Sequence, residues 1–219
     1  MTSSRRPRRS AIAELTDRDL VRLYWPVELR PAFDALFNLE DAFADVVATS
    51  TQPALGAIRL AWWRDALTRL DQYPPPPEPR LQAVATELLP RGIGGARLAT
   101  LEDGWTTLFD ERPDEDRIAD HGAALFAIGA DLLGASDPLT ADAGRIYALA
   151  YVARHGLHPG TSVSLARLIG HRFPLSLRPL TALARLAARD IRSTSGFDPE
   201  ATPGRAAALL SHRLSGVVA

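Results

Sequence analysis

Two aspartates spaced four residues apart are the candidates for metal chemistry in this chain. Asp41 and Asp45 stand at the two ends of the run Asp41-Ala42-Phe43-Ala44-Asp45. Side chains at this spacing share one face of a helix, and carboxylate oxygens are the ligands that magnesium prefers. The pair therefore predicts a magnesium site on a helix. A solvated acidic edge is the alternative, since such pairs are common on exposed helix faces.

Two charged residues, Glu40 and Arg59, each interrupt an apolar helix face. On a helix over 30–49, Glu40 falls near the middle of an apolar arc formed by Phe33, Leu36, Phe37, Phe43, Ala44 and Val47. On a helix over 53–71, Arg59 lies within an apolar arc formed by Leu55, Ile58, Trp62, Trp63, Ala66 and Leu70. A charge in such a position is costly unless it is paired. The short connection makes the two helices an antiparallel hairpin, in which the two residues differ in height by about one helical turn. We predict a buried Glu40–Arg59 ion pair with a structural role; the alternative is that one or both side chains reach solvent.

Three other patterns are compatible with ligand binding, and each has a plainer structural interpretation. The pair His155 and His158 is spaced for a transition metal, or one ring caps a helix. Glycines within 92–95, ahead of a helix, suit a phosphate or an ordinary turn. Four arginines would form an anion-binding face or remain scattered surface charges: Arg145, Arg154, Arg167 and Arg172.

The composition limits the chemistry that the chain can perform. Its 219 residues are 46% apolar and 23% charged with a formal net charge of −1, and lysine and cysteine are absent. Near-zero charge argues against a dedicated nucleic-acid binder, which normally carries a basic surplus. The absence of cysteine excludes thiol nucleophiles, disulfides and cysteine-ligated metals. The absence of lysine excludes Schiff-base catalysis and lysine-dependent phosphate loops.

Helices must position all of these residues. Ala and Leu dominate the sequence, β-branched residues are fewer, and prolines and glycines separate the helical segments. We predict an all-α fold, with one domain over 14–219 behind a disordered basic arm over 1–13. The expected helices, about nine or ten in number, span 17–24, 30–49, 53–71, 80–90, 95–109, 114–134, 140–157, 161–170, 177–192 and 203–215.

Two stretches resemble the squalene/phytoene synthase family. The first is Ala35-Leu36-Phe37-Asn38-Leu39-Glu40, and the second contains Arg59-Leu60-Ala61-Trp62-Trp63-Arg64. The similarity is closest to the short bacterial branch of the family and to the related mitochondrial complex I assembly factor, where a similar F-N-x-E precedes a similar R-x-x-[WF]-W-[RK]. Weaker similarity at 121–125, 144–149 and 177–180 extends it over about residues 17–215. The resemblance implies an isoprenoid-synthase-type helical bundle around a central cavity.

Active members of that family join two allylic diphosphates head to head, with magnesium held by two D-x-x-x-D motifs on facing helices. Aligned on the F-N pair, the first motif falls on Ala42 and Val46, one residue beyond Asp41 and Asp45. One residue is about 100° around a helix. Where active members carry Gln, Asn and the two Asp of the second motif, this chain has Ala148, Tyr151, His155 and Pro159.

The resemblance therefore implies that full metal-dependent catalysis is lost and that no cofactor is needed. If the chain is an active enzyme instead, Asp41 and Asp45 are its remaining magnesium ligands. The aromatic residues that either line an isoprenoid cavity or pack in the core are Phe37, Trp62, Trp63, Tyr147 and Tyr151.

The expected function is that of an isoprenoid-binding or assembly factor, with respiratory complex I as the first role to test. An active prenyltransferase making a squalene- or phytoene-like product, and a helical scaffold without a ligand, remain open. The expected partners are an isoprenoid diphosphate or lipid and a protein of respiratory-complex assembly. We expect a cytoplasmic location, with a peripheral contact to the inner membrane through Tyr24 and Trp25 left open.

Overall fold

The computed structural model describes residues 15–158, 163–194 and 196–219, and this part of the chain is helical without a β-strand. The all-α prediction is confirmed. The predicted arm over 1–13 and Pro159 lie outside the described residues. The α-helices are α1 (Asp17–Arg22), α2 (Arg30–Thr49), α3 (Pro53–Arg69), α4 (Pro79–Glu87), α5 (Gly95–Ala99), α6 (Glu102–Thr106), α7 (Glu115–Leu132), α8 (Thr140–Arg154), α9 (Arg178–Arg192) and α10 (Pro203–Ser215).

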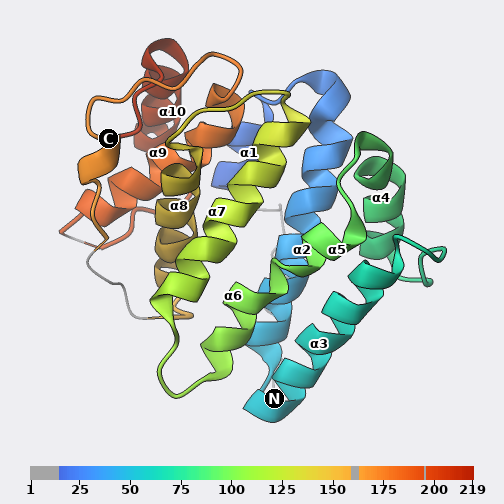
Figure 1. Cartoon of the computed structure of the whole chain (residues 1–219). Helices are drawn as coiled ribbons and strands as arrows, with labels where there is room; N and C mark the ends of the chain where they lie inside the picture. Colours follow the sequence, from blue (N-terminus) through green and yellow to red (C-terminus); the bar gives the residue numbers. More distant parts are fainter. Residues whose placement is uncertain (1–14, 159–162, 195) are drawn as a thin grey trace, which may run out of the picture.

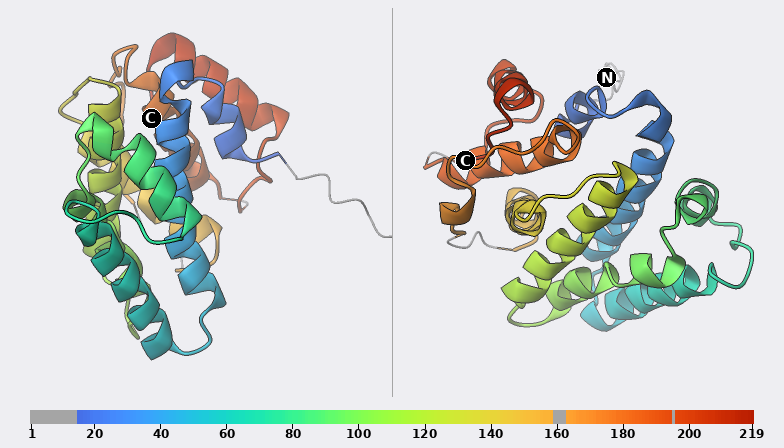
Figure 2. Two further views of the ribbon diagram at one scale, coloured as in Figure 1. Left: turned by 90° about the vertical axis from the view of Figure 1, so that its right-hand side faces the viewer. Right: turned by 45° about the horizontal axis from the view of Figure 1, so that its top comes forward.

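The long helices α2 and α7 run through the middle of the molecule. In Figure 1, α3 to α5 lie to the right of α2, α8 to α10 lie to the left of α7, and α6 lies between α7 and α3. The short helix α1 lies between the start of α2 and α10 in both views of Figure 2. This arrangement brings α1, α2, α8 and α9 around one region, although α1 and α9 are far apart in the sequence.

The core is densest along the buried face of α2. Phe33, Phe37 and Phe43 are fully buried, and the Trp25 ring stacks on Phe33 and Phe37 with centroid distances of 4.8 and 5.5 Å. The spacing of these residues gives α2 one continuous apolar face, which the helix buries against the rest of the bundle. Because Phe37 lies inside this aromatic stack, it packs in the core.

The pairing of α7 with α8 depends on two glycines. A Cβ atom on Gly122 would collide with the Gly144 carbonyl and lie 2.6 Å from the Ala148 Cβ. A Cβ on Gly144 would collide in turn with the Gly122 carbonyl and lie 2.9 Å from the Phe126 Cβ. The two backbones therefore approach as closely as they do only because both positions lack a side chain.

Three details of the predicted helices are wrong. The helix expected over 95–109 is divided into α5, α6 and a 3-10 turn over Thr107–Phe109. The described part of the segment 161–170 contains only the 3-10 turn Ala166–Leu168. Of the apolar arc predicted over 53–71, Trp63 and Leu70 are buried, whereas Leu55, Ile58 and Trp62 are 54%, 65% and 49% exposed. Leu60 and Leu67, which lie outside that arc, are fully buried.

Within the described ranges, no helix combines the length and apolar character that a span of the bilayer requires.

Candidate functional site

A cavity of about 540 Å³ lies among α1, α2, α8, α9 and the segment that leads into α10. This volume is in the range of pockets that hold small organic ligands. Charged residues of α1 and α2 line one side of it, and aromatic and aliphatic residues of α8 and α9 line the other. The cavity is therefore amphipathic, and its two sides are considered in turn.

Two arginines of α1 are held by aspartates of α2 at the charged side. The two terminal nitrogens of the Arg18 guanidinium, Nη1 and Nη2, donate to the Asp41 carboxylate at 2.5 and 2.8 Å. Arg22 donates to Asp34 at 2.7 and 2.6 Å in the same bidentate way. Burial disfavours the charged form of Arg18, but the hydrogen bonds to Asp41, together with the charge of Asp41 and the nearby Tyr147 and Tyr151, outweigh this effect and raise the Arg18 pKa. These pairs fix α1 against α2 at the edge of the cavity.

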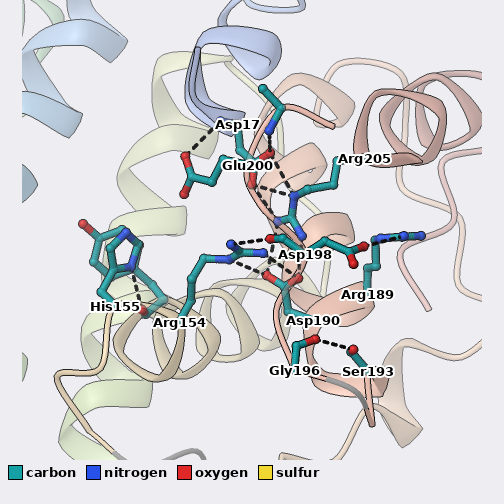
Figure 3. A network of polar contacts seen from close by, with 12 residues as sticks. Asp17, Arg154, His155, Arg189, Asp190, Ser193, Gly196, Asp198, Glu200 and Arg205 are labelled. Atoms are coloured by element: carbon teal, nitrogen blue, oxygen red, sulfur yellow. Dashed lines mark hydrogen bonds and ion pairs between the residues drawn. The ribbon is translucent and has the colours of Figure 1, made fainter. Parts of the chain in front are cut away.

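The floor of the cavity is a buried chain of ion pairs, drawn in Figure 3. Asp190 of α9 accepts hydrogen bonds from Arg154 of α8 at 2.9 Å and from Arg205 of α10 at 2.5 Å. Arg205, which is 1% exposed, also donates to Asp17 of α1 at 2.8 Å. Burial raises the Asp190 pKa, but the hydrogen bonds and charges of the two arginines together lower it by more, so the Asp190 pKa is below its ordinary value. The network joins four helices below the cavity.

The segment before α10 completes this floor. The Ala201 backbone N–H donates to Asp17 at 2.9 Å, and Ala201 has a φ of 52°, in the left-handed region. The Glu200 carboxylate accepts from the Asp17 N–H at 3.2 Å and points away from the Arg205 guanidinium (Figure 3). Glu200 thus lines the cavity without an arginine partner among the described residues.

The opposite side of the cavity is formed by Tyr147 and Tyr151 together with Ala150, Leu183 and Leu186. Both tyrosines were candidates for a substrate cavity, and both line this one. Burial raises the pKa of Tyr151 to about 12 and raises that of Tyr147 further, so both hydroxyls remain protonated at neutral pH. Neither hydroxyl has a hydrogen-bond partner among the described residues.

The predicted magnesium pair does not fit the geometry. Both oxygens of Asp41 are occupied by Arg18, and Asp45 is exposed and pairs with Arg80 at 3.1 Å. Asp41 lines the cavity and Asp45 does not, although the two residues are four positions apart. The described residues contain no group of three or more His, Cys, Asp or Glu side chains that could hold a metal ion together. We therefore derive no chemistry from magnesium here.

The predicted Glu40–Arg59 ion pair is wrong. Glu40 is 5% exposed, and its Oε2 atom lies 2.8 Å from His121 Nε2 and accepts a hydrogen bond from Trp105 Nε1 at 3.3 Å. Arg59 is exposed and donates to Ser50 at 3.3 Å. Glu40 is paired as expected, but its partner comes from α7 because the buried face of α3 turns Arg59 toward solvent.

The Glu40–His121 pair lies directly behind the two tyrosines. His121 Nδ1 lies 2.8 Å from the Leu101 carbonyl oxygen, so both ring nitrogens face acceptors, which only the protonated ring can satisfy. Burial lowers the His121 pKa, but the charge and hydrogen bond of Glu40 exceed that effect and raise it above 6.5. Glu40, His121, Tyr147 and Tyr151 share a small second cavity of about 10 Å³.

The predicted aromatic cavity residues are divided between two environments. Tyr147 and Tyr151 face the cavity, whereas Phe37 and Trp63 are core residues, with Trp63 meeting the Phe43 ring edge-on at 6.1 Å. Trp62 is half-exposed on the surface of α3. Phe37, Trp62 and Trp63 therefore do not line the cavity, because two are packed inside the bundle and one points away from it.

The remaining candidate patterns take their plainer interpretation. His155 stacks on Tyr151 and His158 pairs with Glu115 at 3.2 Å, so the two rings have separate partners. The Asp71 carboxylate accepts hydrogen bonds from the backbone of Gly95 and Ala96 at the start of α5, where a phosphate would have bound.

The four arginines form no common anion-binding face. Arg145, Arg154 and Arg167 each have their own aspartate partner, at 2.7, 2.9 and 2.8 Å, and Arg172 forms an isolated backbone bridge with Val217. The suggested membrane contact through Trp25 does not fit either, because the Trp25 side chain is 2% exposed and lies in the core.

Several cavity residues were missed by sequence reasoning: Arg18, Arg22, Asp190, Glu200 and Arg205. Arginines and acidic residues on short helices look like ordinary surface charges, and their partners lie up to 188 positions away. Asp190 stands among alanines and leucines in the middle of an apolar face of α9, and this position was the available signal.

Comparisons of the whole chain with protein-family models, with curated proteins and with solved structures found no match.

Proposed function

We propose that this protein binds an isoprenoid or a similar long apolar molecule in the cavity between α1, α2, α8 and α9 and acts as an assembly factor rather than as a magnesium-dependent synthase. The observation that carries the proposal is the state of Asp41. This carboxylate borders a cavity large enough for a ligand, yet both of its oxygens are held by Arg18. A cavity large enough for a ligand is thus present without carboxylates that are free to hold magnesium.

The apolar side of the cavity supports binding of a hydrocarbon chain. Leu183, Leu186 and Ala187 of α9 line this side together with Ala150 and Tyr151 of α8. Apolar contact area of this kind contributes about 25 cal/mol per Å² removed from water. The resemblance to squalene/phytoene synthases favours an isoprenoid as the source of that chain.

The exposed face of α3 supports the role in assembly. Leu55, Ile58 and Trp62 follow one another at helical spacing and are 49–65% exposed. Arg59 and Arg69 lie on the same helix without a carboxylate partner among the described residues. Such a face suits a protein surface that is apolar at its centre and acidic at its edge, and tryptophan is enriched among residues that dominate binding. By the resemblance, the partner belongs to respiratory complex I assembly.

The ligand half of the proposal is tested with purified protein, magnesium, and farnesyl and geranylgeranyl diphosphate. We expect no release of diphosphate and no condensed product, whereas prenyl compounds displace a hydrophobic dye from the cavity. Ala150→Leu fills the cavity and should abolish displacement, while Ala96→Leu on the exposed surface of α5 should not. Magnesium-dependent diphosphate release that is lost in Asp41→Ala would establish the active prenyltransferase instead.

The assembly half is tested in cells that lack the protein. We expect reduced assembly of respiratory complex I and restoration by the unaltered chain. The double variant Ile58→Ser, Trp62→Ser should fail to restore it, and Leu214→Ser, which alters an even more exposed leucine on α10, should succeed. Normal complex I levels in cells without the protein would contradict this role.

A further inference from the structure

The charges that line the central cavity favour an uncharged ligand head group. Four guanidinium groups line it, from Arg18, Arg22, Arg154 and Arg205, and the six carboxylates that line it belong to Asp17, Asp19, Asp34, Asp41, Asp190 and Glu200. With His155 counted as neutral, the formal charge of the lining is −2. A ligand with several negative charges therefore meets net repulsion in this cavity.

Each of the four guanidinium groups is already engaged by a carboxylate. The Arg18–Asp41 and Arg22–Asp34 pairs are bidentate, with distances of 2.5–2.8 Å. Arg205 is enclosed between Asp17 and Asp190, and Arg154 donates twice to Asp190. To bind a diphosphate, the protein would have to break these pairs and leave aspartates unpaired in a partly buried site, which is costly.

The hydrogen-bond donors in the cavity that belong to no ion pair are neutral. The hydroxyls of Tyr147 and Tyr151 and the side-chain amide of Asn38 have no hydrogen-bond partner among the described residues, and all three line the cavity. Because burial keeps both tyrosines protonated, their hydroxyls are donors that suit an oxygen acceptor. These donors lie on the apolar side of the cavity, next to the place proposed for a hydrocarbon chain.

We propose that the cavity selects a long apolar molecule with an uncharged oxygen head group, such as an alcohol or a ketone, and discriminates against the corresponding diphosphate. This inference rests on the proposed binding of an isoprenoid-like chain and specifies its head group. The Tyr147 and Tyr151 hydroxyls bind the head-group oxygen, and the residues of α9 contact the chain.

Equilibrium dialysis of the full chain with radiolabelled farnesol and farnesyl diphosphate tests this inference. The two probes share one chain and differ only in the head group. We expect farnesol to bind at least about tenfold more tightly, and Tyr151→Phe to weaken farnesol binding about 3- to 10-fold, the loss expected for one neutral hydrogen bond. Circular dichroism of each variant verifies that it is folded.

A change of charge gives a second, independent measurement. Glu200→Gln removes one negative charge and keeps an oxygen that accepts from the Asp17 N–H, so the floor network is preserved. It should tighten farnesyl diphosphate binding about 2- to 5-fold relative to farnesol binding, whereas Glu111→Gln, outside the cavity, should leave this ratio unchanged.

The outcomes separate the inference from the function on which it rests. Tighter binding of farnesol together with the Glu200→Gln effect supports the inference. Tighter binding of farnesyl diphosphate overturns the inference and leaves the proposed binding of isoprenoids intact. If neither probe binds, the proposed ligand is wrong and the inference is overturned with it.

Discussion

Removal of the Arg205 side chain tests whether the floor of the cavity holds the fold together. Arg205 is 1% exposed and forms ion pairs with two carboxylates, those of Asp17 and Asp190, which are 8% and 7% exposed. In Arg205→Met, Asp190 keeps Arg154, whereas Asp17 keeps only the Ala201 N–H among the donors described above. The variant therefore contains a buried carboxylate without a compensating cation.

Loss of one partner from a buried ion pair costs about 3–5 kcal/mol, and we expect the lower part of that range because Asp190 keeps Arg154. This is a large fraction of the total stability of a domain, which is about 5–15 kcal/mol. Urea unfolding followed by circular dichroism measures the change. The matched control is Arg167→Met, since Arg167 pairs with Asp142 at 2.8 Å but is 68% exposed. Its expected cost is about 0–1 kcal/mol.

The pH dependence of this difference identifies its cause. An unpaired buried carboxylate is tolerated once it is protonated, so the stability gap between the unaltered chain and Arg205→Met should narrow as the pH falls to about 4. Loss of packing alone would give a gap that does not change with pH. The argument about buried charge is refuted if Arg205→Met lowers the free energy of unfolding no more than Arg167→Met does. It is also refuted if the loss caused by Arg205→Met is the same at neutral pH and at about pH 4.

Three further predictions concern helix packing and the buried histidines. Gly144→Ala should lower the melting temperature markedly, because its Cβ collides with the α7 backbone, whereas Gly204→Ala at the exposed start of α10 should have little effect. Burial and the nearby arginines lower the His212 pKa from 6.5 to about 4, so the unfolded chain binds the extra proton and stability should fall by about 3 kcal/mol as the pH drops from 6.5 to 4. The His121 pKa is raised, so the stability that His121 provides is fully present below pH 6.5 and is lost as the pH rises through the His121 pKa of the folded protein. In urea titrations, Glu40→Gln should remove this loss of stability with rising pH.

The sequence was informative about which face of a helix is buried and less informative about which residues of other helices that face contacts. On α2, the apolar spacing of Phe33, Leu36, Phe37 and Phe43 correctly identified the buried face, because one long helix with one apolar stripe leaves little choice. Glu40 was correctly expected to need a partner on that face. Its partner His121 is 81 positions away on α7, and a helical projection of α2 contains no information about it.

Helix α3 shows why the same method failed one helix later. Apolar residues surround this helix on several sides, so the arc with Leu55, Ile58 and Trp62 was as plausible a core face as the one actually buried. Tertiary packing decided between them: Gly56 admits the Phe109 ring, and a Cβ there would overlap that ring. A close approach of this kind is a property of two distant segments and has no signature in either one alone.

In the candidate site too, spacing within one helix was informative and contacts between helices were not foreseen. Tyr147 and Tyr151 both line the cavity, whereas of Asp41 and Asp45 only Asp41 does. Spacing alone predicts that two residues share a helix face, and it does not include the charges that compete for them. Arg18 and Arg80, on other helices, draw the two carboxylates into separate ion pairs.

The charges around the cavity therefore have a role in folding that restricts their role in binding. Helix α1 is six residues long, and isolated helices of this length are unstable. It is held in place by Arg18 and Arg22 toward α2, and by Asp17 toward α9 and α10 through Arg205. A magnesium–diphosphate group would compete for these same carboxylates and guanidiniums and would release α1. The charged side of the cavity thus holds α1 in place, while its apolar side remains available for a ligand. A ligand without charge would leave the ion pairs of α1 intact.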